Sequence, residues 1–228
     1  MTDLSTHDAP VCPVGEPVCS VVDRVVELQN EVETLSELIR TDNLTGLYNQ
    51  RYLIETLELE MERTRRTGRF TAIVMFDLDH FKQVNDTWGH ESGNAVLKKT
   101  AEVVGKAIRK LDVACRYGGE EFVIVLPNTG LIEAAFVAER IRYKLEASTI
   151  LVEGGEINVT ASFGVDIFTE HQKATAEELI SRADGYLYDA KENGRNQVNH
   201  VPAEKISHEA QISIDERDAI FDMFGDQE

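Results

Sequence analysis

Two short acidic clusters are the residues of this 228-residue chain best suited to chemistry. Asp77 and Asp79 close the apolar run Phe70–Leu78, and Glu120 and Glu121 follow a pair of glycines. Carboxylates beside a buried strand are costly unless they face solvent or a cation. One acidic pair is usually a solvated edge. Two clusters framed by strands and glycines favour a Mg²⁺ site, because Mg²⁺ takes one or two carboxylates together with water and phosphate oxygens.

The segments around these acids alternate between strand and helix patterns. Strand patterns cover Phe70–Leu78, Val113–Tyr117, Glu121–Leu126 and Asn158–Phe168. Helix patterns cover Tyr52–Arg66, Gly93–Lys110, Leu131–Ala147 and Ala176–Lys191. The Gly118–Gly119 pair between two strands is a hairpin signal. The mixture predicts an α+β or α/β layered fold with the acidic clusters at the ends of strands.

Residues 1–40 differ in pattern from the rest of the chain. After a loose, proline-containing arm, a seven-residue apolar repeat begins at Val18, and a second row lies three residues later; together they are Val18, Val21, Val25, Leu28, Val32, Leu35 and Ile39. β-Branched residues in the first row and leucine mostly in the second favour a parallel two-stranded coiled coil. The alternative is an amphipathic helix lying on its own domain. We therefore divide the chain into an arm and helical stalk (1–40), a central domain (41–200) and an acidic tail (201–228) with one short amphipathic segment, Ile214–Phe224.

Charge limits the classes of partner. The net charge is −18, and residues 1–40 and 201–228 each hold eight acidic and two basic residues. This balance argues against nucleic acid and anionic membrane surfaces, which need basic patches. No apolar run approaches the length of a membrane span and no signal peptide is evident. Three cysteines cannot all pair with one another, which fits a reducing cytoplasm.

The acidic clusters are part of a longer series of motifs. In chain order these are Asp42–Asn49, Phe76–Lys82 with Asn85–Asp86, Gly89–Gly93, Gly118–Phe122, Ser162–Val165, Ala183–Asp184, and Ala190–Lys191 with Gly194–Asn196. In content, order and spacing the series resembles the GGDEF-domain diguanylate cyclases, with the signature in its Gly-Gly-Glu-Glu-Phe form. The resemblance covers residues 42–196.

The resemblance implies a fold and a reaction. The family fold is a five-stranded, mostly antiparallel sheet flanked by helices, like the palm of nucleotidyl cyclases and polymerases. The reaction condenses two GTP into cyclic di-GMP and two pyrophosphates. Each domain holds one GTP, so two domains must meet with their sites facing, and the expected active species is a homodimer.

The resemblance also assigns roles to residues. Asp77, Glu120 and the backbone carbonyl of Leu78 are expected to hold Mg²⁺ or Mn²⁺, with Glu121 as a further ligand. Glu120 is also the expected general base, and Lys82 is the second catalytic candidate because of its charge. The expected substrate contacts are the backbone amides near Phe81 and Lys82, the side chains of Asn85, His90 and Asn94, and the cations of Lys191 and Arg195. For His90 a structural hydrogen bond is the alternative.

One substrate contact departs from the family pattern. Asn94 stands where the family usually has aspartate, which accepts hydrogen bonds from the guanine edge. Asparagine accepts through its carbonyl but is neutral and also donates. We expect GTP as the main substrate, with weaker discrimination against adenine.

Arg109 and Asp112 form an Arg-x-x-Asp motif six residues before the signature. Such a motif is usually a local ion pair, but in the family this position is the inhibitory site for the cyclic di-GMP product. Arginine bonded to the guanine O6 and N7 atoms is the chemistry expected there.

The sequence is compatible with three functions. They are an active cyclase, a receptor that binds cyclic di-GMP without catalysis, and a cyclase that makes a mixed dinucleotide. The acids that degenerate receptors typically lose, Asp77, Glu120 and Glu121, are all present, which favours the first. The stalk is also the expected site for a regulatory protein.

Overall fold

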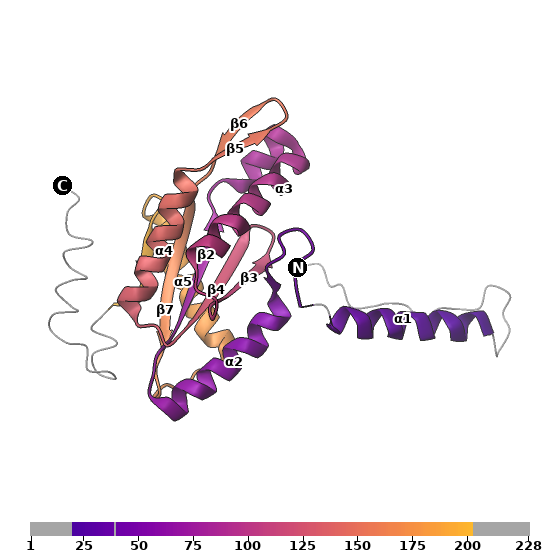
Figure 1. Cartoon of the computed structure of the whole chain (residues 1–228), viewed down its shortest axis with the longest axis horizontal. Coiled ribbons are helices and arrows are strands. Elements are labelled where there is room, and N and C mark those ends of the chain that lie inside the picture. Colours follow the sequence, from indigo (N-terminus) through magenta and orange to yellow (C-terminus); the bar gives the residue numbers. More distant parts are fainter. Residues whose placement is uncertain (1–19, 39, 203–228) are drawn as a thin grey trace. The chain divides into compact units, whose positions relative to one another are not determined.

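The computed structural model describes residues 20–38 and 40–202, and the chain divides into two compact units, 1–40 and 41–228 (Figure 1). In the first unit, helix α1 (Ser20–Leu38) confirms that the heptad repeat is helical. Val21, Val25 and Leu28 of the repeat are exposed. Val18 and Ile39 lie outside the described residues, as does the predicted amphipathic segment of the tail.

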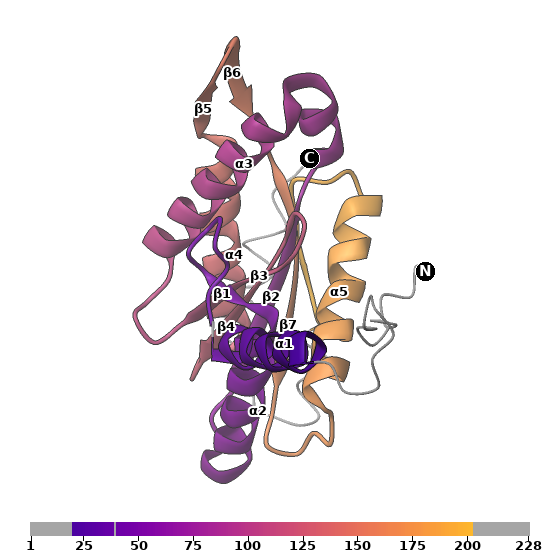
Figure 2. The ribbon, with the colours of Figure 1, turned by 90° about the vertical axis from the view of Figure 1, so that its right-hand side faces the viewer.

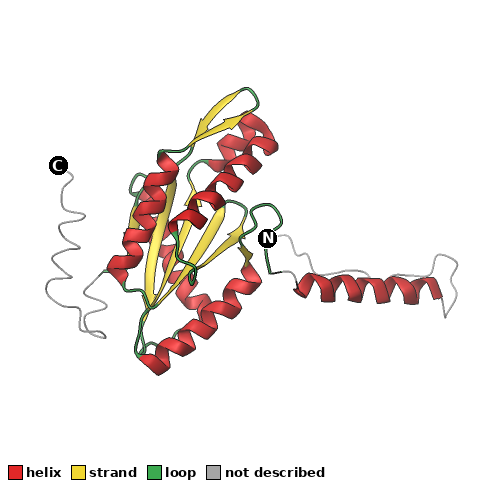
Figure 3. Cartoon of the chain, in the orientation of Figure 1, coloured by secondary structure: helices red, strands yellow, loops and turns green. Residues whose placement is uncertain are grey.

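A mixed sheet forms the centre of the second unit (Figure 3). Its six strands lie in the order β1-β3-β4-β2-β7-β8. They are β1 (Tyr48–Asn49), β2 (Thr71–Leu78), β3 (Val113–Gly118), β4 (Glu121–Pro127), β7 (Ala161–Phe168) and β8 (Val198–His200). The four central strands pair antiparallel, whereas the edge strands β1 and β8 pair parallel to their neighbours. The expectation of five strands was therefore one short.

Helices cover both faces of the sheet. On one face lie α3 (Phe81–Ala107) and α4 (Leu131–Glu146), and on the other lie α2 (Gln50–Thr67) and α5 (Ala176–Glu192) (Figure 2). The α+β class is as predicted.

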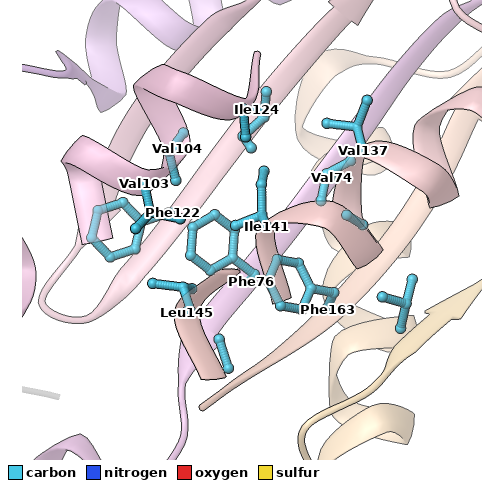
Figure 4. Packing of buried hydrophobic residues seen from close by; sticks show 14 of the residues in the cluster. Val74, Phe76, Val103, Val104, Phe122, Ile124, Val137, Ile141, Leu145 and Phe163 are labelled. Atoms are coloured by element: carbon cyan, nitrogen blue, oxygen red, sulfur yellow. The ribbon is translucent and has the colours of Figure 1, made fainter. Parts of the chain in front are cut away.

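Strand β2 sends alternate side chains into two hydrophobic cores. Phe76 joins the core under α3 and α4, and its ring stacks on Phe122 and Phe163 with centroid separations of 5.0 and 4.8 Å (Figure 4). Ile73 and Met75 point into the core under α2 and α5. All eight residues of β2 are buried, so packing on both faces fixes the position of the end of the strand, where Asp77 lies.

Several elements were missed by the periodicity of the sequence, among them the edge strands β1 and β8. The helix predicted from Gly93 begins at Phe81, because α3 is two helical pieces that meet at a kink, where Gly89 has a φ of 80°. A two-stranded hairpin, β5 (Thr149–Val152) and β6 (Gly155–Asn158), was also missed. The indole of Trp88 packs against its turn, since a Cβ added to Gly155 would lie 2.9 Å from the ring.

Candidate active site

The two acidic clusters meet where β2 ends. The antiparallel register of β2 and β4 places Asp77 directly opposite Glu121. The amide of Leu78 donates to the carbonyl of Glu120 at 3.4 Å, which holds the glycine turn of the β3–β4 hairpin against the end of β2. The sheet thus brings together residues that are more than forty positions apart in sequence. Asp77, Leu78, Glu120 and Glu121, the predicted metal ligands, all lie at this end.

The acids repel one another, and a lysine offsets part of that repulsion. Burial raises the pKa of Asp77 to about 6, and nearby Glu120 and Glu121 add to the rise, although Lys191 opposes it from 2.9 Å. Burial, with Asp184 and Glu120 close by, also raises the pKa of Glu121. A site that concentrates this much negative charge at a buried position is suited to a cation.

The donor set fits a magnesium or manganese ion that carries its own phosphate ligands. No group of three or more acidic, histidine or cysteine side chains within residues 20–38 and 40–202 forms a ready metal cage. Mg²⁺ needs no such cage, because it keeps waters and substrate phosphates and takes only one or two carboxylates. Asp77, Glu120 and the Leu78 carbonyl supply oxygen ligands of the kind that it prefers.

The phosphate site expected from the sequence falls at the start of α3. His80 precedes the helix in a left-handed conformation, with a φ of 58°, and its side chain does not cap the first turn. The backbone amides of Phe81 and Lys82 lie in that turn, where an anion is favoured. The ring of Phe81 is buried in the core, whereas the Lys82 side chain is exposed.

Asn85 and Asn94 lie on the two pieces of α3. The Asn85 side chain occupies the space beside Gly93, where an added Cβ would lie 2.0 Å from its Oδ1 atom. Glycine is therefore required there if Asn85 is to keep this position. Asn94 is half-buried in the next turn. His90 is exposed and has no hydrogen-bond partner among the described residues, so the structural bond considered for it is absent there.

Helix α5 and the turn that follows it carry the remaining cations. It packs directly on β7 at Gly164, where an added Cβ would lie 2.1 Å from the carbonyl oxygen of Ala183. This close approach brings Lys191, near the end of α5, to Asp77. The exposed Arg195 follows in the next turn, where its guanidinium donates to the Lys191 carbonyl at 3.4 Å. Glu120, Lys191 and the start of α3 thus belong to one end of the sheet.

Comparison with known proteins decides the family. The sequence profile described as "Diguanylate cyclase, GGDEF domain" matches residues 39–197, well over half of the chain. The chain belongs to the GGDEF family of diguanylate cyclases.

Relatives of this GGDEF domain occur in several bacteria. The chain is 42% identical over 173 residues to the response regulator PleD of Caulobacter vibrioides, covering 75% of this chain and 38% of PleD. It is 40% identical over 175 residues to diguanylate cyclase A of Treponema denticola, covering 74% of this chain and 47% of the relative. The chain therefore spans less than half the length of these curated relatives.

Solved structures agree with the fold. The Pseudomonas aeruginosa diguanylate cyclase SiaD, crystallised with its activator SiaC, has 38% identity and a TM-score of 0.68, covering 80% of this chain and 70% of SiaD. The coiled coil and GGDEF domain of DgcB from Caulobacter crescentus, in complex with c-di-GMP, has 28% identity and a TM-score of 0.68, covering 80% of this chain and 97% of that one.

The Arg-x-x-Asp motif of this GGDEF domain lies in the turn between α3 and β3. Asp112 is buried and accepts a hydrogen bond from the backbone amide of Arg109 at 2.7 Å, whereas the Arg109 side chain is exposed. Burial raises the pKa of Asp112. The aspartate thus fixes the turn through its backbone, which leaves the guanidinium of Arg109 available to a ligand.

A pocket of about 690 Å³ lies beside this turn. Leu111 lines it, together with Arg63, Arg66 and Arg69. Thr71 and Pro127 also line it, so it lies at the opposite end of β2 and β4 from the acidic site. Within the described residues, this pocket and the acidic site thus lie at opposite ends of the central strands.

One member of the acidic clusters does not join the site. Asp79 turns away from Asp77 and accepts hydrogen bonds from Thr160, Ser162 and the backbone of Asn196. Sequence reasoning had grouped it with Asp77 because both follow the same strand. Strand alternation could not have separated the two residues, because side chains two positions apart point to the same face. Asp79 differs because it lies beyond the end of β2, in the turn that leads to α3.

Proposed function

We propose that this protein is a diguanylate cyclase, which condenses two GTP into cyclic di-GMP and releases two pyrophosphates. The supporting observation is the register of β2 and β4, which places Asp77, Glu120 and Glu121 at one sheet end together with Lys191. In each half-reaction the 3′-hydroxyl oxygen of one GTP bonds to the α-phosphorus of the other. The bond from that phosphorus to the pyrophosphate breaks, and the hydroxyl proton passes to Glu120 as general base.

Product analysis tests this proposal. The full chain is incubated with GTP and Mg²⁺, and the products are separated by chromatography. We expect cyclic di-GMP and pyrophosphate. A protein that binds cyclic di-GMP but forms none would instead be a receptor, and a mixed guanine–adenine product from GTP with ATP would identify the third candidate function.

We propose Mg²⁺ or Mn²⁺ as the cofactor, held by Asp77, Glu120 and the Leu78 carbonyl, with Glu121 as a further ligand. The bound ion would offset the negative charge of the triphosphate. Lys191, paired with Asp77 at 2.9 Å, would add its positive charge to the same site and offset the charge of the phosphates.

Substrate is held by the residues around the acidic cluster. The amides of Phe81 and Lys82 bind phosphate oxygens at the start of α3, and the charges of Lys82 and Arg195 neutralise them. Asn85 and Asn94 hydrogen-bond the guanine edge. His90 is exposed and follows the kink residue of α3. We propose that it also contacts the substrate.

Asn94 gives a prediction about base selectivity. We expect Asn94→Asp to improve the preference for GTP over ATP by roughly tenfold, because a carboxylate accepts from the guanine N1–H and amino group and repels the acceptor N1 of adenine. Inhibition of product formation from GTP by added ATP measures this for both proteins. Glu91→Gln, a neighbouring change on the exposed surface of α3, is the control. Identical ATP sensitivity of the wild type and Asn94→Asp would disprove the idea.

We propose that cyclic di-GMP also binds at Arg109 and Asp112 and inhibits the enzyme. Support comes from the exposed Arg109 side chain on a turn that Asp112 fixes, and from the neighbouring pocket with Arg63, Arg66 and Arg69, since the product carries two phosphates.

Arg109 gives a prediction about inhibition. We expect Arg109→Ala to relieve inhibition by added cyclic di-GMP at least about tenfold, because a bidentate contact to guanine is lost. The initial rate is expected to stay the same, since Arg109 lies at the end of the domain away from Asp77. Initial rates against added product measure both quantities, and Lys110→Ala serves as the adjacent control. Unchanged sensitivity in Arg109→Ala would remove this residue from the inhibitory site.

We propose that the active form is a homodimer joined through α1. Each domain holds half of the reacting pair, and a coil makes the meeting of two domains intramolecular. DgcB was likewise solved with a coiled coil, and SiaD with a separate activator. A regulatory protein bound to the stalk would then shift the domains between facing and non-facing arrangements. Within the described residues no helix is both long and apolar enough to cross a bilayer.

A further inference from the structure

Asp79 is a buried carboxylate that the proposed reaction leaves without a role. It is 5% exposed and forms no ion pair with any described lysine or arginine. Instead it accepts three short hydrogen bonds: from Thr160 Oγ1 at 2.7 Å, from Ser162 Oγ at 2.7 Å and from the backbone amide of Asn196 at 3.1 Å. A carboxyl group that is this deeply buried and bonded only to neutral donors is uncommon, so its position calls for a physical reason.

These bonds tie together three segments at the active-site end of the sheet. Asp79 follows β2, and its own amide donates to the Thr160 carbonyl at 2.9 Å. Thr160 and Ser162 flank the first residue of β7. Asn196 belongs to the turn that leads from α5 to β8. The carboxylate therefore fixes the α5–β8 turn to the strand that carries Asp77.

The backbone of that turn is strained. Arg195 and Asn196 are consecutive residues other than glycine in the left-handed region, with φ of 63° and 45°. Such conformations are strained for residues that carry a Cβ atom, and they persist only where surrounding contacts enforce them. Here Asp79 binds the Asn196 amide. Arg142 Nη1 donates to Asn196 Oδ1 at 3.0 Å, and Asn196 Nδ2 donates to Glu146 at 2.8 Å.

We infer that Asp79 is a positioning residue that holds the α5–β8 turn so that Arg195 faces the nucleotide phosphates. The inference deepens the proposed function and rests on it for the identity of the ligand. Arg195 is the residue whose direction the strained backbone sets, and among the described residues its guanidinium has only one weak contact, to the Lys191 carbonyl. Asp79 acts through this turn and touches neither substrate nor metal.

The first test measures how well the turn is held in the absence of ligand. Hydrogen exchange of the Asn196 amide is compared by NMR in the full chain, in Asp79→Ala and in Asp79→Asn. Alanine removes the acceptor, so exchange is expected to accelerate at least about tenfold. Asparagine keeps an acceptor oxygen toward Asn196 and Thr160, and its amide group faces the Ser162 hydroxyl, which also accepts. Exchange in Asp79→Asn is therefore expected to stay near that of the wild type.

The second test reads the effect on the ligand. Equilibrium affinity is measured for a GTP analogue with a non-cleavable bridge between the α and β phosphorus atoms. Asp79→Ala and Arg195→Ala are each expected to weaken binding roughly tenfold, the size of one charge-assisted contact. The double variant is expected to bind no more weakly than Arg195→Ala alone, because both changes remove the same interaction. Ser162→Ala, which removes another partner of Asp79 but spares the Asn196 bond, is expected to keep wild-type affinity.

Failure of this inference differs from failure of the cyclase proposal. Wild type that binds the analogue but forms no cyclic product from GTP would overturn the cyclase and leave the role of Asp79 standing. Three results would each overturn the positioning role. They are additive losses of affinity in the double variant, wild-type affinity in Asp79→Ala, and unchanged exchange of the Asn196 amide in Asp79→Ala. An equal loss of analogue affinity in Asp79→Asn and Asp79→Ala would also overturn it, because the hydrogen bond to Asn196, which asparagine keeps, would then not explain the loss.

Discussion

Replacing Asp77 or Glu120 by alanine is expected to abolish cyclic di-GMP formation and leave the protein folded. Each change removes an oxygen ligand of the proposed metal ion from a site where charge develops, a loss of several kcal/mol and on the order of a 10³-fold fall in turnover. The fold should tolerate both changes. The Asp77 carboxylate is disfavoured by its own burial, and Glu120 is half-buried in a turn that is held by a backbone bond.

Turnover and thermal unfolding are measured for each variant over a range of Mg²⁺ and Mn²⁺ concentrations. Glu58→Ala, which removes the same charge from the exposed face of α2, is the matched control and should behave as wild type. Partial recovery at high metal concentration would support the ligand role. Product formation near the wild-type rate by either variant would refute the assignment of the metal site, and a large fall in melting temperature would instead indicate a structural role.

Removing the stalk is expected to convert the enzyme from a dimer into a largely monomeric, slow form. Tethered domains meet at effective concentrations of about 1 mM, so residues 41–228 alone should lose on the order of 10²-fold or more in rate at sub-micromolar concentration. Polar replacement of Val25, Leu28, Val32 and Leu35 should have the same effect, because it removes the apolar seam of the coil. Val25 and Leu28 are exposed, as a seam that lacks its partner would be.

Mass from light scattering and rate against enzyme concentration measure the two consequences. Val26→Gln is the control, because Val26 is an exposed apolar residue of α1 outside the heptad rows. An unrelated two-stranded coil fused before residue 41 should restore activity to the truncated protein. If the truncated or polar-substituted protein stays dimeric and equally active, the repeat packs on its own domain and the dimer forms elsewhere.

Much of the fold could be predicted from local pattern alone. The buried run at β2, the Gly118–Gly119 hairpin and the periodic helices α2, α4 and α5 lie within a few residues of their predicted bounds. Two of the missed elements share a physical reason. The first piece of α3 and the β5–β6 hairpin are stabilised by contacts such as that of Trp88 with Gly155, which join positions far apart in sequence. No periodicity within either segment records such a contact.

The sequence by itself identified the candidate residues, because the motifs fix residue type and spacing, and these are local properties of the chain. Only the tertiary structure decided which neighbours each of these residues has. Asp77 and Asp79 are indistinguishable as letters, yet the sheet register turns Asp77 to Glu121 and Lys191, whereas Asp79 meets Asn196. The reason is that the charge balance and hydrogen bonding of a carboxylate depend on neighbours within a few ångströms, and at this site most of those neighbours come from distant segments of the chain.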